Sequence, residues 1–182
     1  FRRVLFRSLN EVLGTLRSMF IDKSARHQIV IVRQVLEAVR DLISQEAARS
    51  EIELRIESED ELKFCGRQSE LQHALLNLAI NSIQALHNNG AQDKNIILSA
   101  STSADGLHIG VTDNGPGIKD DQLPCLFALM NSEKPDGMGI GLWICRHIAE
   151  RHQGTITHRP NLPRGAIFEI TLPRDSMQDL PA

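Results

Sequence analysis

The sequence predicts one α/β domain, a two-layer sandwich in which helices cover one face of a mixed, mainly antiparallel sheet. The chain has 182 residues, which is long enough to bury a core without metals or disulfides. A hydrophobic fraction of 41% with 24% charged residues is typical of a globular domain. The predicted elements combine hairpins with helical crossovers, and this combination favours a mixed sheet over a doubly wound parallel one.

Charge, cysteines and hydropathy limit the possible partners and compartments. A net charge of -3 and a pI near 6.2 argue against a protein that neutralises nucleic-acid backbones, so we expect no nucleic-acid partner. Cys65, Cys125 and Cys145 show no paired metal-binding spacing, which indicates free thiols in a reducing compartment. No apolar run approaches the roughly 18 residues of a membrane span, so we expect the chain as given to be soluble.

The first part of the chain predicts two helices. Residues 9–20 carry apolar side chains at a spacing of three and four, which is typical of an amphipathic helix. The same periodicity predicts a second helix from about Arg26 to Arg49. The apolar stripe of this second helix contains Ile29, Val32, Leu36, Val39, Leu42 and Ile43.

The middle of the chain predicts a strand, a short partner strand and a third helix. Residues 51–57 alternate apolar and charged side chains as a half-buried strand does, and residues 62–65 follow as a short partner. Residues 68–88 carry a long apolar stripe that ends in the turn-forming sequence Asn88-Asn89-Gly90.

The second half of the chain predicts two hairpins that flank a loop and a helix. The first hairpin joins residues 95–101 and 107–112, and its second strand leads directly into Asp113. The polar connection 118–136 is long for a simple loop and is typical of a functional lid. A helix opens at Gly137–Gly141 and continues to about His152. The final hairpin joins residues 154–158 and 166–172.

Two asparagines on the third helix are candidate ligands. At roughly 100° per residue, Asn77 and Asn81 both border the buried stripe of this helix. One interpretation is ordinary polarity at the edge of the core. The functional interpretation is a pair of carboxamide oxygens for Mg²⁺ and a triphosphate, since a hard cation prefers oxygen ligands.

Five of the 12 glycines fall between residues 115 and 141. The run 137–141 leads into a helix, whose free N–H groups and dipole favour a phosphate. A simple glycine-rich turn is the alternative. No Gly-Lys-Ser/Thr follows the run, so it is not a P-loop, and Asn161 replaces the acid expected in a dinucleotide fold.

Asp113 ends a predicted strand and precedes Asn-Gly-Pro-Gly. A carboxylate in this place can simply form an Asx turn. Its alternative role is to accept a hydrogen bond from the exocyclic amine of adenine.

Four motifs occur together and in order: NLAINSIQAL (77–86), DNGPGI (113–118), GMGIGL (137–142) and GAIFEITLP (165–173). Together they resemble the catalytic, ATP-binding domain of sensor histidine kinases over about residues 28–174. This family belongs to the superfamily of gyrase, the mismatch-repair ATPase and the heat-shock chaperone ATPase. The resemblance implies the Bergerat-type ATP-binding fold, with ATP and Mg²⁺ as ligands.

The resemblance also implies residue roles. Asn81 would hold Mg²⁺ with Asn77 beside it, Asp113 would recognise adenine, and Lys134 would reach phosphate from the lid. The implied catalytic residues are Asn77, Asn81 and Lys134. The implied nucleotide-binding residues are Asn77, Asn81, Asp113, Gly115, Gly117, Ile118, Lys134, Gly137, Met138, Gly139, Ile140, Gly141 and Leu142.

One feature, at position 77, favours phosphoryl transfer over hydrolysis. The hydrolysing relatives carry a glutamate where this chain has Asn77, and an amide cannot act as the general base for water. The family's acceptor is a histidine followed by an acid, but none of the 7 histidines precedes Asp or Glu. We therefore expect the acceptor on a separate dimerisation domain.

The expected division of the chain is a basic start and helical stub at 1–24, the catalytic domain at 25–176 and a tail at 177–182. The expected partners are the dimerisation and histidine phosphotransfer domain of the same protein and the receiver domain of a response regulator. We expect the full-length protein to be a homodimer, with this domain on the cytoplasmic side of a membrane-attached sensor.

The lid departs from the family pattern. Of the usual Phe-Phe pair only Phe127 is kept, and Met130 and Asn131 occupy neighbouring places. The altered lid leaves a degenerate nucleotide-binding module open as an alternative. An ATP-hydrolysing conformational switch and a serine/threonine kinase of the same superfamily also stay open.

Overall fold

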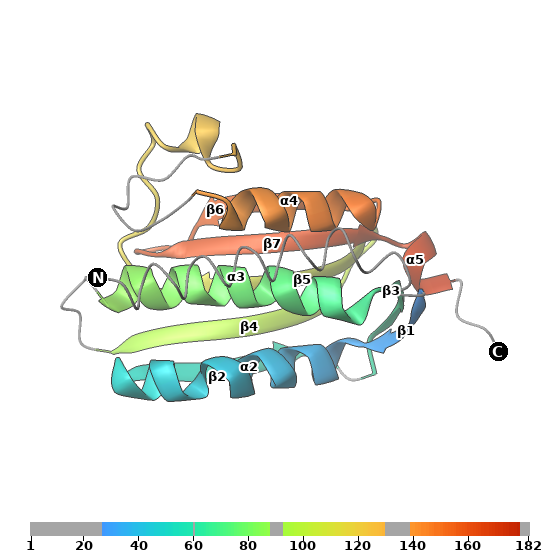
Figure 1. Ribbon diagram of the computed structural model, residues 1–182, viewed down its shortest axis with the longest axis horizontal. Coiled ribbons are helices and arrows are strands. Elements are labelled where there is room, and N and C mark those ends of the chain that lie inside the picture. Colours follow the sequence, from blue (N-terminus) through green and yellow to red (C-terminus); the bar gives the residue numbers. More distant parts are fainter. Residues whose placement is uncertain (1–26, 60, 88–92, 130–138, 179–182) are drawn as a thin grey trace, which may run out of the picture.

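The computed structural model describes residues 27–59, 61–87, 93–129 and 139–178. A five-stranded sheet has the order β2-β4-β5-β7-β6, and α2, α3 and α4 cover one of its faces (Figure 1). The pair β2–β4 is parallel and the other neighbours in this sheet are antiparallel. The predicted class, a two-layer α/β sandwich with a mixed, mainly antiparallel sheet, is confirmed.

The strands are β1 (Gln28–Ile31), β2 (Ile52–Ser58), β3 (Lys63–Gly66), β4 (Lys94–Thr102), β5 (Gly106–Asp113), β6 (Thr155–Pro160) and β7 (Ala166–Pro173). The helices are α2 (Val32–Arg49), α3 (Gln68–His87), α4 (Gly141–Arg151), the short α5 (Asp175–Gln178) and the 3-10 helix η1 (Leu123–Cys125). The helix over 68–88 and both predicted hairpins are therefore confirmed. The start of α4 at Gly141 lies inside the predicted range.

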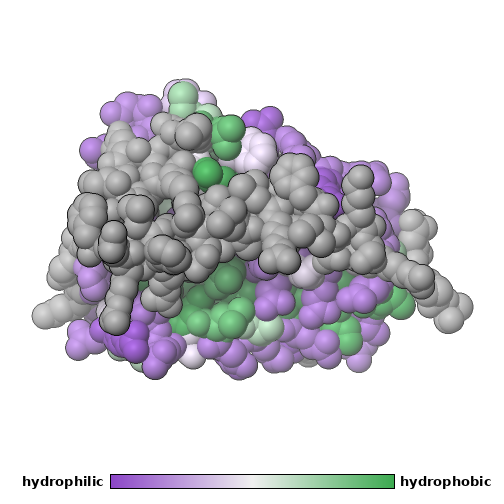
Figure 2. Space-filling view, in the orientation of Figure 1, coloured by the Kyte–Doolittle hydropathy of each residue, from purple (hydrophilic) through white to green (hydrophobic). Residues whose placement is uncertain are grey.

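The core lies between the sheet and the helices. Alternate residues of β5 and β7 face the helix layer, among them Ile109 and Ile170, which are fully buried. From α3, Leu75 and Leu78 are also fully buried. Each such side chain contributes about 1.5–3 kcal/mol by leaving water. This packing fixes the ends of the strands relative to α3. On the face seen in Figure 2, hydrophobic residues gather between α2 and α3.

Two expectations for the first part of the chain are wrong. The predicted helix from Arg26 includes a strand, β1, and Ile29 is 43% exposed instead of buried. Three consecutive β-branched residues, Ile29 to Ile31, favour extended backbone, which explains this difference. Leu42 is also outside the buried stripe, at 60% exposure, while the neighbouring Ile43 is buried.

The segment 62–65 does not pair with β2. It forms most of β3, which pairs antiparallel with β1 in a small separate sheet. The N–H of Val32 donates to the carbonyl of Leu62 at 2.9 Å and so joins the start of α2 to this sheet. The partner of β2 is instead β4. Helix α5 packs beside β3 and was not predicted from the sequence.

A polar cluster lies where α3 begins and α4 ends. Glu70 Oε1 lies 3.0 Å from Arg151 Nη2 and 3.5 Å from Arg67 Nη1, and the Glu70 side chain is only 12% exposed. The imidazole of His152 is buried beside Glu70 and its two arginines. Its Nδ1–H donates to the carbonyl of Ile148 at 2.9 Å, and its Nε2 accepts the N–H of Arg67 at 3.1 Å. Burial lowers the pKa of His152, which is therefore neutral at pH 7.

Several predictions concern residues outside the described part of the chain. These are the helix over 9–20, the later part of the predicted lid, and the tail beyond residue 178. Cys65, Cys125 and Cys145 are free thiols as expected. Burial raises the pKa of the Cys145 thiol, which donates to the carbonyl of Ala74 at 3.4 Å. Among the described helices, none is long and apolar enough to cross a membrane.

Candidate functional site

Asp113 is a buried carboxylate at the end of β5. Its side chain faces α3 and the residue is only 3% exposed. Oδ1 accepts the N–H of Gly115 at 2.9 Å and the N–H of Ala166 at 3.4 Å, and Oδ2 accepts the hydroxyl of Ser82 at 2.9 Å. A carboxylate offers about four acceptor positions, so these three donors leave one on Oδ2. The arrangement suits an additional N–H donor such as an aromatic amine.

The loop after Asp113 is held by hydrogen bonds from three sides. Asn114 Oδ1 accepts the N–H of Asn95 at 2.9 Å, and Asn114 Nδ2 donates to the carbonyl of Asp93 at 2.7 Å. Asn161 Nδ2 donates to the Asp113 carbonyl at 2.9 Å. These contacts tie the β6–β7 connection and the start of β4 to the end of β5, so the Asp113 backbone is fixed before any ligand arrives.

Two glycines are required where this loop meets the β6–β7 connection. Gly117 has a φ of +77°, and a Cβ there would lie 3.1 Å from the Gly165 carbonyl oxygen. Gly165 has a φ of +120°, and its Cβ would lie 1.9 Å from the Asp113 carbonyl oxygen. Both conformations are rare for residues with a side chain. Close backbone approach, achieved with glycine, therefore builds this part of the site.

Asn77 and Asn81 lie one turn apart on α3, and both are half-buried. Within the described residues, neither carboxamide takes part in a hydrogen bond. Ser82, the next residue after Asn81, is buried and binds Asp113, so α3 brings the asparagines to the same end of the sheet. The free carboxamide oxygens match the preference of a hard divalent cation that arrives with phosphates.

Helix α4 begins at the same end of the molecule (Figure 1). Gly139 has a φ of +63°. Among the residues that the structure describes, no side chain caps the start of α4 at Ile140, and a Cβ on Gly141 would meet nothing within 4 Å. The first N–H groups of α4 and the positive end of its dipole suit an anion. The ring of Trp143, in the first turn of α4, stacks on the ring of His147 with the centroids 5.5 Å apart and the planes parallel within 1°.

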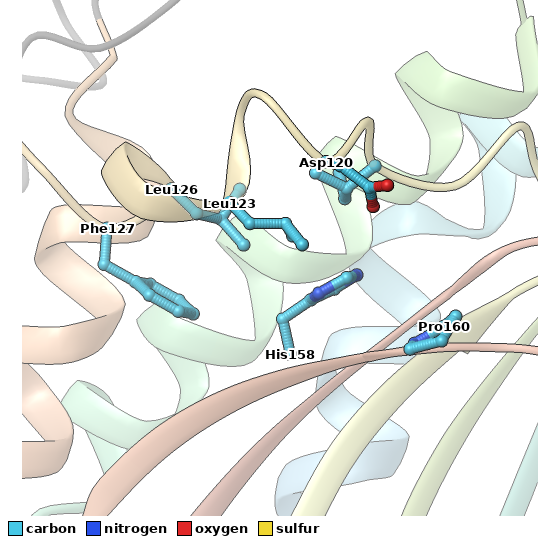
Figure 3. Close-up of a pocket in the computed structure, with 7 residues that line it drawn as sticks. Asp120, Leu123, Leu126, Phe127, His158 and Pro160 are labelled. Atoms are coloured by element: carbon cyan, nitrogen blue, oxygen red, sulfur yellow. The ribbon is translucent and has the colours of Figure 1, made fainter.

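A cavity of about 340 Å³ lies between β6 and the segment that follows Gly117 (Figure 3). Its walls are mainly apolar, with His158 and Asp120 as the polar groups. Its lining residues are Ile118, Asp120, Leu123, Leu126, Phe127, His158 and Pro160. The volume falls within the range of small-molecule sites, roughly 300–1,000 Å³.

The structure brings most of the predicted site residues to one end of the sandwich. Asn77, Asn81 and Asp113 lie there on α3 and β5. The glycine-containing segments follow at the end of β5 and at the start of α4: Gly115, Gly117, Ile118, Gly139, Ile140, Gly141 and Leu142. The predicted residues Lys134, Gly137 and Met138 lie outside the described part of the chain.

Three residues at this end of the sandwich were missed at the level of sequence: Ser82, His158 and Asn161. Ser82 occupies a core position of the α3 stripe, and a polar side chain in such a position signals a buried partner. His158 falls on the inward phase of its strand, two residues after Ile156, which is a similar signal. Nothing in the local sequence marks Asn161 as a partner of Asp113.

A family described as histidine kinase-, DNA gyrase B-, and HSP90-like ATPase matches residues 66–176. This match spans more than half of the 182 residues, and the chain therefore belongs to this family. The matched region runs from the end of β3 to α5 and contains the whole end of the sandwich described above.

Sensor histidine kinases are among the similar curated proteins. The sensor histidine kinase ZraS of Escherichia coli K12 is 34% identical over 166 residues, which cover 91% of this chain and 35% of ZraS. The C4-dicarboxylate transport sensor protein DctS of Rhodobacter capsulatus is 35% identical over 103 residues, 57% of this chain and 16% of DctS. The chain thus spans about a third or less of the length of these relatives.

Solved structures agree with this family. Full-length ShkA, crystallised in complex with AMPPNP, has a TM-score of 0.74 and 26% identity, covering 90% of this chain and 34% of ShkA. The catalytic domain of histidine kinase ThkA has a TM-score of 0.72 over 82% of this chain and 96% of that domain. At 22% identity, the ThkA comparison supports the fold alone. The predicted resemblance to histidine kinase catalytic domains is confirmed.

Proposed function

We propose that this chain binds ATP as the catalytic domain of a sensor histidine kinase and transfers the γ-phosphoryl group to a histidine of a dimerisation domain. The observation that carries the proposal is the Asp113 carboxylate, which keeps one acceptor position and is hydrogen-bonded to α3, the helix that carries Asn77 and Asn81. The family membership and the sensor histidine kinases among the relatives support the same activity.

Asp113 is the proposed adenine-binding residue. Its three donors are neutral, so the carboxylate keeps its negative charge and its last acceptor position for the exocyclic amine of the base. The amine donates this hydrogen bond in a site from which water is largely excluded. A hydrogen bond to a charged group under these conditions contributes about 1.5–3 kcal/mol.

The phosphates are the proposed ligands of α3 and α4. Asn81, with Asn77 beside it, would hold Mg²⁺, which neutralises charge on the triphosphate when bound. The N–H groups at the start of α4 and the backbone of 137–142 would bind phosphate oxygens. Lys134 would add a positive charge from the lid. Gly115, Gly117 and Ile118 would border the sugar.

The proposed reaction is a phosphoryl transfer. A nitrogen of the acceptor imidazole forms a bond to the γ-phosphorus while the bond from phosphorus to the bridging β–γ oxygen breaks, which leaves ADP. Catalysis of this kind depends on positioning and charge neutralisation. Asn77 cannot take a proton from water, so hydrolysis is slow. The catalytic unit is residues 25–176, flanked by a stub at 1–24 and a tail at 177–182.

The proposed assembly follows from this reaction. The acceptor histidine lies on the dimerisation domain of the same protein, which forms a homodimer, and the receiver domain of a response regulator takes the phosphoryl group next. The domain acts on the cytoplasmic side of the membrane. The free thiols of this chain are compatible with that compartment.

Calorimetry of ATP binding, with and without Mg²⁺, tests this function. We expect Asp113→Asn to weaken ATP binding by about thirtyfold to a hundredfold, since it removes the charged acceptor. We expect Asn81→Leu to remove the part of the affinity that depends on Mg²⁺. The control is Glu53→Gln on the exposed side of β2, which should bind as the unchanged protein does.

Hydrolysis followed in the same samples separates transfer from the other activities. Slow ADP release by the isolated chain, together with ATP binding, is the expected result. Rapid turnover without an acceptor would show a hydrolysing switch instead, and no binding by the unchanged chain would show a degenerate module.

A further inference from the structure

His158 has a buried nitrogen without a partner. It lies on β6 and its ring enters the cavity beneath Leu123 and Leu126, between Phe127 and Pro160 (Figure 3). Within the described part of the chain, Nε2 is buried and makes no hydrogen bond. A buried polar atom of this kind costs about 1–3 kcal/mol unless a ligand or water satisfies it. His158 lines this cavity, so a ligand bound there would lie against its ring.

The register of the sheet places His158 two strands away from Asp113 and one row further from the strand ends. His158, Phe168 and Val111 form one row across β6, β7 and β5, and the next row toward the strand ends contains Pro160, Ala166 and Asp113. Asp113 and His158 are close enough for the carboxylate to act on the imidazole electrostatically. Both side chains therefore serve the same end of the helix-covered face.

The cavity suits a flat aromatic ring. Its apolar walls come from Ile118, Leu126 and Phe127, and the Phe127 ring stands perpendicular to that of Phe168 at 6.3 Å. The ring of His158 lies 5.2 Å from Phe168 and so is braced in its place. Mainly apolar walls with a few placed polar groups are typical of sites for small heteroaromatic ligands.

Resting on the proposed function, we propose that His158 is a second base-recognising residue: its Nε2–H donates to a ring nitrogen of the purine whose amine binds Asp113. The two ring nitrogens beside that amine are N1 and N7. Burial lowers the pKa of His158, so the imidazole is neutral at pH 7 and carries one N–H. With Asp113 as acceptor and His158 as donor, the pair matches an amine next to an unprotonated ring nitrogen.

This pair would set specificity among purines. Guanine has a carbonyl in place of the amine and a protonated N1. Its carbonyl oxygen would face the carboxylate of Asp113, and two acceptors cannot form a hydrogen bond. Sites built from buried polar groups reject such ligands because their own groups then lose their partners.

A double-mutant cycle that pairs residue with ligand atom tests the proposal. Calorimetry measures the binding of ATP, 1-deaza-ATP and 7-deaza-ATP to the unchanged chain, His158→Val and His158→Gln. We expect the unchanged chain to bind one of the two deaza analogues about tenfold more weakly than ATP. His158→Val should bind that analogue and ATP equally, and His158→Gln, which keeps an N–H, should restore part of the difference.

Two controls make the outcome specific. Thr157→Val lies next to His158 on the same strand but on the opposite, exposed side, and should leave all three affinities unchanged. Thermal unfolding of each variant shows that it is folded.

Equal discrimination by the unchanged chain and His158→Val would overturn the role of His158, as would equal affinities of the unchanged chain for all three nucleotides. ATP binding that is lost in Asp113→Asn would leave the proposed function intact in either case. Absence of ATP binding by the unchanged chain would overturn both proposals.

Discussion

The two ends of the helix layer each bury a carboxylate, and they differ in the groups that surround it. Glu70 lies against the guanidinium groups of Arg67 and Arg151. Asp113 has only neutral donors, from Ser82 and two backbone N–H groups. Two cations beside Oε1 balance the charge of Glu70, whereas the neutral donors leave the charge of Asp113 unbalanced. This difference favours the Asp113 end as the proposed binding site.

The histidines at the two ends show the same contrast. Burial lowers the pKa of both His152 and His158. His152 uses both ring nitrogens within the protein, one as donor and one as acceptor. His158 leaves Nε2 buried and without a partner among the described residues. Burial thus lowers the pKa of both imidazoles, and the two differ in whether each ring nitrogen has a hydrogen-bond partner among the described residues.

The largest expected effect concerns the backbone at the Asp113 end. Gly165→Ala should destabilise the protein by roughly 3 kcal/mol, because the new Cβ would overlap the Asp113 carbonyl and φ is positive. The matched control is Gly141→Ala, where the Cβ meets open space. Urea unfolding of both variants measures the difference, and equal stabilities would show that close backbone approach does not build this site.

Glu70→Gln is expected to have the next largest effect. The amide no longer balances the charges of Arg67 and Arg151, and partial exposure reduces the cost of a broken buried pair to about 2 kcal/mol. ATP affinity should not change. Chemical denaturation and calorimetry of this one variant measure both quantities, and a loss of ATP affinity as large as that of Asp113→Asn would erase the contrast between the two ends.

Ser82→Ala should have a smaller effect at the Asp113 end. It removes one of the three neutral donors, which costs about 1 kcal/mol of stability. Nucleotide affinity should fall by less than in Asp113→Asn, because the charge of the acceptor is kept. Thermal unfolding and ATP titration of Ser82→Ala check this order, and an effect on ATP equal to that of Asp113→Asn would assign base recognition to the hydroxyl as well.

The pH dependence of stability is the smallest expected effect. Because the pKa of His152 is lowered in the folded state, the unfolded chain binds more protons once the pH falls below about 6.5. The contribution of His152 to the free energy of unfolding should therefore be fully present above pH 6.5. It should decline as the pH falls from 6.5 toward the folded-state pKa. In His152→Gln the decline should be shallower. The pKa of His158 is also lowered and adds to the decline. The measurement is therefore the difference in the free energy of unfolding between His152→Gln and the unchanged protein, from denaturant titrations at each pH.

Long periodic segments explain why most of the fold could be predicted. Residues 68–87 repeat the helical pattern over many turns, and β4, β5 and β7 alternate over seven or more residues. The predicted start of α2 was wrong because Ile29 and Val32 also fit a helical spacing. The pairing of β1 with β3 joins segments more than 30 residues apart, and no local pattern encodes it.

The candidate site shows a similar division. Asn77, Asn81, Asp113 and the glycine segments could be predicted because they form short motifs with recognisable chemistry. Asn161 could not, because its contact with Asp113 depends on how the β6–β7 connection folds back on β5. The only indication for His158 was its position in the alternating pattern of β6. That position shows that His158 faces inward only once it is known that its partner Phe168 on β7 faces inward.

The stacked rings on α4 give the molecule an optical property of its own. Trp143 is the single tryptophan of the chain and lies in the first turn of α4, directly after the glycine segment. Its indole is stacked on the imidazole of His147. Excitation at wavelengths that select indole therefore reports on one turn of one helix, so emission from the unlabelled chain follows events at the start of α4 as they occur.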